Sequence, residues 1–173
     1  ISHVQLKVSN LERSIQYYEQ IIGFKTLRKE DGVAYLSADG KTSLLSLTEV
    51  QNALPLRDGY TGLYHFALLL PTLKDLGNIV QHFINNNVRI GASDHHVSQA
   101  LYLNDPDGNG IEIYVDRDNS DWHWDNRNNV HMTTTQLDFN PIIAAADGNW
   151  NGLPEGTVMG HIHLSIKNIA ESE

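Results

Sequence analysis

The stretch 101–114, LYLNDPDGNGIEIY, decides the fold of this 173-residue chain. Its two ends are rich in apolar and β-branched residues, which predicts strands over 99–104 and 110–116. Its centre, 104–110, combines Asn, Asp, Pro and Gly, the residues that favour a turn. The stretch therefore predicts two strands joined by a turn, with one carboxylate, Glu112, flanked by isoleucines.

A longer unit precedes this pair of strands. Residues 65–70, HFALLL, have the length of a buried strand and begin with His65. Thr72 to Asp75 then has the form of a capped helix start, with apolar residues at helical spacing after it. A further strand over 88–91 completes the order βαβββ for residues 62–116.

The same order occurs earlier in the chain, over residues 1–50. His3 opens a strand over 3–8, and Ser9 and Glu12 have the spacing of a capping box. Gly23 is placed to end the following helix. Three short strands are expected after it, over 24–29, 33–38 and 42–48.

A third copy begins near residue 158. His161 opens the strand 161–166, and the sequence stops at Glu173, within the next expected helix. One strand and half a helix cannot bury an apolar face, so 158–173 is interpreted as the opening of a second half of a longer polypeptide. Residues 117–157, rich in Asn, Asp, Gly and Thr, form an aromatic-rich connector, interpreted either as packed over a module or as a lid, with a short helix expected over 138–146.

The amino-acid composition narrows the classes of partner and site that this chain can have. The formal net charge of −9 argues against nucleic acid or an anionic membrane as a partner. The absence of cysteine excludes disulfides and thiolate metal sites, and fits a cytoplasmic protein. No apolar stretch approaches the roughly 20 residues of a membrane span, and no signal peptide is visible. A small molecule is the expected partner.

Three side chains indicate a metal site. His3 and His65 stand at the same position, at the start of the first strand of their modules. Glu112 alternates with isoleucines and needs a partner, because an unpaired buried charge is costly. If two matching modules face one another, His3, His65 and Glu112 hold one divalent metal ion, a set of two imidazoles and one carboxylate that leaves coordination positions open.

These segments resemble a known family. The openings at His3 and His65, and above all 100–117, resemble the vicinal oxygen chelate superfamily of glyoxalases, bleomycin-resistance proteins and extradiol dioxygenases. The run 132–163 resembles its two-halved, catechol 2,3-dioxygenase-like bacterial members. The resemblance implies an α+β fold of paired βαβββ modules, which form a curved, partly open mixed β-sheet barrel with helices outside.

The resemblance also implies an activity. Glyoxalase-type sites have four protein ligands, but the strand 42–48 carries no ligand at the position matching Glu112. Three ligands remain, as in the dioxygenases, and His161 is assigned to a site in the second half. The implied reaction is ring cleavage of a catechol-like diol by dioxygen, with Fe(II) as the metal; Mn(II), Zn(II) and Ni(II) also suit such ligands.

Two further positions match the dioxygenase pattern. Tyr102 stands ten residues before Glu112, and His95 and His96 stand shortly before Tyr102. By the resemblance, Tyr102 hydrogen-bonds the substrate or a metal-bound oxygen, and one of the two histidines, left open here, is an acid–base group. A glyoxalase-type lyase and a non-catalytic small-molecule binder are the alternatives. Members of the superfamily commonly pair modules between chains, so a homo-oligomer is expected.

Overall fold

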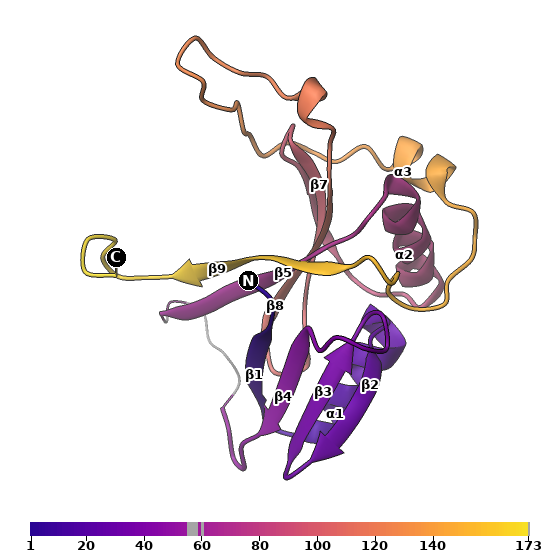
Figure 1. Cartoon of the computed structure of the whole chain (residues 1–173), viewed down its shortest axis with the longest axis vertical. Coiled ribbons are helices and arrows are strands. Elements are labelled where there is room, and N and C mark those ends of the chain that lie inside the picture. Colours follow the sequence, from indigo (N-terminus) through magenta and orange to yellow (C-terminus); the bar gives the residue numbers. More distant parts are fainter. Residues whose placement is uncertain (55–58, 60, 173) are drawn as a thin grey trace.

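The computed structural model describes residues 1–54, 59 and 61–172. Glu173 of the expected third copy lies outside the described residues, as do 55–58 and 60 within the expected 1–116 unit. The α+β class and the two βαβββ modules are confirmed, and the described strands form two open mixed sheets (Figure 1).

The first module forms a four-stranded sheet in the order β1-β4-β3-β2. Strands β1 and β4 are parallel, and the other pairs are antiparallel. Gly23 ends the helical segment with a φ of +93°, as expected for a glycine C-cap. The elements are β1 (Val4–Val8), α1 (Leu11–Tyr17), the π-helical turn η1 (Tyr18–Ile22), β2 (Lys25–Glu30), β3 (Val33–Ser37) and β4 (Leu45–Glu49).

The second module forms the other sheet, in the order β6-β7-β8-β5-β9. Thr72 caps its helix, as predicted, by accepting a hydrogen bond from the Asp75 amide. Its last strands match the predicted ones, but β6 begins three residues later than expected, because Val88 still donates to the Phe83 carbonyl at the helix end. The elements are β5 (Gly62–Leu69), α2 (Leu73–Asn85), β6 (Gly91–Asp94), β7 (Ser98–Asn104) and β8 (Gly110–Asp116).

The fifth strand of this sheet comes from the third copy. Strand β9 (Val158–Ser165) runs antiparallel to β5 along its free edge. A strand has two edges, and β8 and β9 occupy both edges of β5. The described strands thus form two sheets and no closed barrel: β1 is the edge strand of its own sheet, and β9 lies along the second edge of β5 (Figure 1).

The turn between β7 and β8 joins the two modules. Asp107 accepts hydrogen bonds from the Ser9 amide (3.2 Å) and hydroxyl (2.5 Å), and pairs with Arg13 at 2.8 Å. Asp105 accepts one from the buried Tyr18 hydroxyl at 2.9 Å. Ser9 is thus engaged by the second module, and Asn10 caps α1 instead, which corrects the capping-box prediction.

The connector packs against both modules. It contains the short 3₁₀ helix η2 (Asn119–Asp121) and α3 (Phe139–Ala145), close to the helix expected over 138–146. Trp150 stacks on His82 of α2, with ring centroids 4.5 Å apart, and Leu153 donates to the Gly23 carbonyl. Within the described residues, no helix is both long and apolar enough to cross a membrane.

Candidate metal centre and active site

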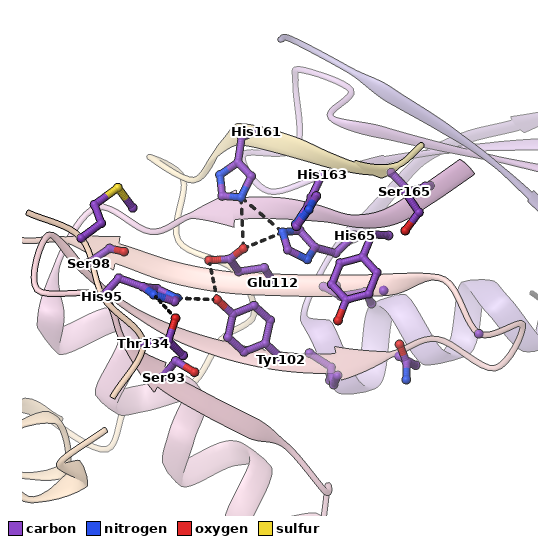
Figure 2. A pocket seen from close by; sticks show the side chains of 18 of the residues that line it. His65, Ser93, His95, Ser98, Tyr102, Glu112, Thr134, His161, His163 and Ser165 are labelled. Atoms are coloured by element: carbon purple, nitrogen blue, oxygen red, sulfur yellow. Dashed lines mark hydrogen bonds and ion pairs between the residues drawn. The ribbon is translucent and has the colours of Figure 1, made fainter. Parts of the chain in front are cut away.

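Three neighbouring strands bring two histidines and one glutamate together. In the pairing register, Ala67 of β5 lies opposite Glu112 of β8 on one side and His161 of β9 on the other. His65 is two residues from Ala67, so its side chain projects from the same face of the sheet. Because Ala67 has only a methyl group, the three larger side chains can converge above it (Figure 2).

The ligand atoms of this His65–Glu112–His161 cluster lie close together. Glu112 Oε2 is 2.8 Å from His65 Nε2 and 3.1 Å from His161 Nε2, and the two nitrogens are 3.3 Å apart. For ligand bonds of about 2.1 Å, ligands at right angles lie about 3.0 Å apart and tetrahedral ligands about 3.4 Å apart. The three separations therefore fit a divalent ion bound on one face, with further coordination positions open.

Burial and the neighbouring histidines have opposite effects on the pKa of the carboxylate in this cluster. Glu112 is 4% exposed. Burial opposes its ionisation, but the hydrogen bond from His65 and the charges of both histidines outweigh burial and lower the pKa of Glu112. The carboxylate is thus held ionised, which is the form that binds a cation.

A hydrogen-bonded chain leads from the cluster to His95. The Tyr102 hydroxyl lies 3.3 Å from Glu112 Oε1 and 2.8 Å from His95 Nε2, and its one proton can be donated to only one of these two atoms at a time. His95 Nδ1 lies 2.8 Å from the carbonyl oxygen of Thr133 in the connector. A carbonyl can only accept, so Nδ1 carries a proton and Nε2 of the neutral ring is free to accept one. Burial, followed by the charge of Glu112, raises the pKa of Tyr102, which keeps its hydroxyl protonated.

His96 lies apart from this chain of contacts. Its backbone has a φ of +67°, and its ring packs 5.6 Å from that of His131. It lines a smaller hollow, of about 290 Å³, with Arg117 and His123, whereas His95 lines the large cavity above the cluster. Of the two histidines that the sequence left open, the structure brings His95 to the site.

His3 lies in the other sheet. Its Nε2 is 2.9 Å from the Ser46 hydroxyl, and its Nδ1 is 3.1 Å from the Ser43 carbonyl. Strand β1 pairs Gln5 with Ser46, as β5 pairs Ala67 with Glu112. Ser46 therefore occupies in module one the position of Glu112 in module two.

Only part of the ligand set predicted from the sequence comes together in the structure. The structure brings together His65 and Glu112 but not His3, and it adds His161, which the sequence analysis assigned to a different site. The signal for His161 was present in the repeat, since it stands at the same strand position as His65. What the sequence lacked was the pairing of β9 with β5.

A cavity of about 870 Å³ lies over the cluster. Its walls come from β5, β7, β8 and β9, and Met132 and Thr134 of the connector also line it. Trp150 thus packs on a module, as in one of the two interpretations that the sequence left open, and Met132 and Thr134 line one side of the cavity. The lid stays a prediction.

Comparison with known proteins identifies the family. The profile of the Glyoxalase/Bleomycin resistance protein/Dioxygenase superfamily matches residues 1–113, and the chain belongs to this superfamily. A catechol-2,3-dioxygenase of Bacillus subtilis is 46% identical over the whole chain, which spans 61% of the length of that relative. Biphenyl-2,3-diol 1,2-dioxygenase 3 of Rhodococcus globerulus is 27% identical over 90% of the chain and 84% of its own length.

Solved structures agree on the fold. A glyoxylase/bleomycin resistance protein/dioxygenase domain from Frankia superposes with a TM-score of 0.58 at 22% identity, over 68% of this chain and 97% of that domain. Enzymes of the superfamily bind a divalent metal, and the His65–Glu112–His161 cluster can hold one.

Proposed function

We propose that this chain carries the site of an extradiol ring-cleaving dioxygenase that acts on a catechol-like aromatic diol. The observation that carries the proposal is the facial His65–Glu112–His161 cluster with His95 and Tyr102 beside it. The similarity to a catechol-2,3-dioxygenase supports the same assignment.

His65, His161 and Glu112 are the proposed metal ligands, and Fe(II) is the proposed metal. Fe(II) bound there would supply open positions for the diol and dioxygen, and the electron exchange between them. The two neutral imidazoles and the single carboxylate of the cluster leave one positive charge uncompensated. That charge favours binding of the diol as a singly ionised catecholate.

His95 is the proposed general base. Because the Thr133 carbonyl holds the proton on Nδ1, Nε2 can accept the proton that a diol hydroxyl loses on binding. An imidazole in this place can accept that proton and return it later in the reaction.

Tyr102 is proposed to position these groups. Its hydroxyl lies between His95 Nε2 and Glu112 Oε1. A protonated phenol can donate to a substrate oxygen at this place, and its raised pKa argues against its acting as the base.

Anaerobic loading with Fe(II), followed by oxygen uptake and ring-cleavage absorbance with catechol, tests the proposal. We expect one oxygen molecule consumed per ring cleaved by the Fe(II) protein and none by the Zn(II) protein, because Zn(II) has no redox chemistry. Activity on a thiohemiacetal with Zn(II) or Ni(II), and none on catechols, would favour a glyoxalase-type lyase instead. Binding of catechol without turnover with any metal would favour a non-catalytic binder.

A further inference from the structure

The cavity has two unlike sides. On one side, the hydrogen bonds described above join His95, Tyr102 and Glu112. On the other side stand Tyr64, His163 and Ser165, from β5 and β9; Figure 2 shows the last two beyond His65. We call these three residues the polar wall.

The polar wall is built around His163. In the register of β5 and β9, His163 lies directly opposite His65 and two residues from His161. Its ring packs edge-on to that of His65, with centroids 4.9 Å apart, and also lies 4.9 Å from the Tyr64 ring. Two aromatic neighbours thus fix the ring at the cavity surface.

Within the part of the chain that the structure describes, the polar atoms of this wall have no hydrogen-bond partner and can bind a ligand. Among the described residues, the hydrogen bonds between side chains that line the cavity join His65, His161, Glu112, Tyr102, His95 and Thr134. They leave the His163 nitrogens and the Tyr64 and Ser165 hydroxyls unengaged. An imidazole and two hydroxyls together offer several donors and acceptors without a fixed charge.

The volume of the cavity and the charge of its lining residues narrow the class of ligand that can bind at the polar wall. The cavity, of about 870 Å³ and half open to solvent, has far more room than one catechol ring fills. Among the described lining residues, Glu112 is the one carboxylate, and none is Lys or Arg. An ionised substituent would therefore find no opposite charge among the described residues of this wall.

We propose that the polar wall is a specificity subsite for a catechol with a neutral, hydrogen-bonding substituent, such as a hydroxymethyl or carboxamide group, and that His163 is its main determinant. This inference rests on the proposed function, because it takes the diol to bind at the metal centre. The substituent then reaches the polar wall and hydrogen-bonds with the imidazole.

Binding to the Zn(II)-loaded protein tests this without turnover. Dissociation constants are measured for catechol, for 3- and 4-hydroxymethylcatechol, for the size-matched 3- and 4-ethylcatechol, and for 2,3- and 3,4-dihydroxybenzoate. His163→Phe keeps a ring against His65 and Tyr64 but removes both nitrogens, and Ser165→Ala removes one hydroxyl. His123→Phe, at an exposed position outside the cavity, is the matched control.

We expect the protein to bind one hydroxymethyl isomer about 3- to 10-fold more tightly than its ethyl counterpart, the usual effect of one neutral hydrogen bond. His163→Phe should abolish that preference and leave the affinity for catechol within about twofold, whereas His123→Phe should change neither. An equal or reversed preference in the native protein, a preference that survives His163→Phe, or tighter binding of a dihydroxybenzoate would overturn the inference. Catechol with the Fe(II) protein tests the proposed function separately, so the two can fail independently.

Discussion

Replacing His161 and His3 by alanine, one at a time, distinguishes the ligand set that the structure brings together from the set predicted from the sequence. Both histidines open the first strand of a module, and the sequence alone gives no reason to prefer His161. In the structure, His161 Nε2 lies 3.1 Å from Glu112 Oε2, whereas His3 bonds with Ser46 and Ser43 in the other sheet. The two substitutions are therefore matched in chemistry and differ in place.

The expected magnitude follows from the number of ligands. Structural zinc sites with four protein ligands bind with about 10–16 kcal/mol, or about 2.5–4 kcal/mol per ligand. Each 1.4 kcal/mol is a factor of about ten, so His161→Ala should raise the dissociation constant by about 60- to 700-fold. His3→Ala should leave it within about twofold, because His3 contributes no ligand atom to the cluster.

Competition with a chelator of known affinity measures the dissociation constants, with Zn(II) and Co(II) as metals. The visible spectrum of Co(II) also reports a change in ligand set, and circular dichroism checks that both variants remain folded. Equal weakening by the two substitutions, or native affinity in His161→Ala, would refute the assignment of His161 and restore the set with His3.

Two further predictions concern the first module. Ser46→Glu places a carboxylate beside His3, as Glu112 stands beside His65, so the variant should bind a second, weaker metal ion per chain. Adding His3→Ala to this variant should remove the second ion. Metal content after dialysis measures the stoichiometry, and one ion per chain in the Ser46→Glu variant would contradict the equivalence of the two positions. Asp107→Asn should lower the free energy of unfolding by about 2 kcal/mol at pH 7, because Asp107 accepts charge-assisted bonds from Ser9 and Arg13. Burial of Asp107 is outweighed by these bonds, which lower its pKa below 3.8, so the native contribution is present above that pH and is lost as the pH falls through the lowered pKa. Denaturant unfolding should accordingly give stabilities that converge as the pH falls below 3.8 and through the lowered pKa of Asp107. A difference that stays constant throughout the acid titration would contradict the role of this ion pair.

Local sequence determined the elements of this protein. The turn residues over 104–110 and the alternating strands on either side specify β7 and β8, and Thr72 and Gly23 mark helix ends through their own backbone preferences. The repeat of these signals also predicted both modules and singled out His65. The flanking isoleucines singled out Glu112, and the resemblance to the dioxygenases singled out Tyr102. The capping-box prediction for Ser9 failed because its hydroxyl donates to Asp107, which lies 98 positions further along the chain.

Tertiary structure decided which strands meet. Every module opens with a histidine on its first strand, and the repeat makes His3, His65 and His161 equivalent in sequence. Hydrogen bonds between strand edges are made by backbone groups that every residue carries, so the sequence of β5 does not say whether β1 or β9 lies beside it. The pairing of β9 with β5 brings His161 to Glu112, whereas His3 hydrogen-bonds with Ser46. Only the three-dimensional structure shows this pairing.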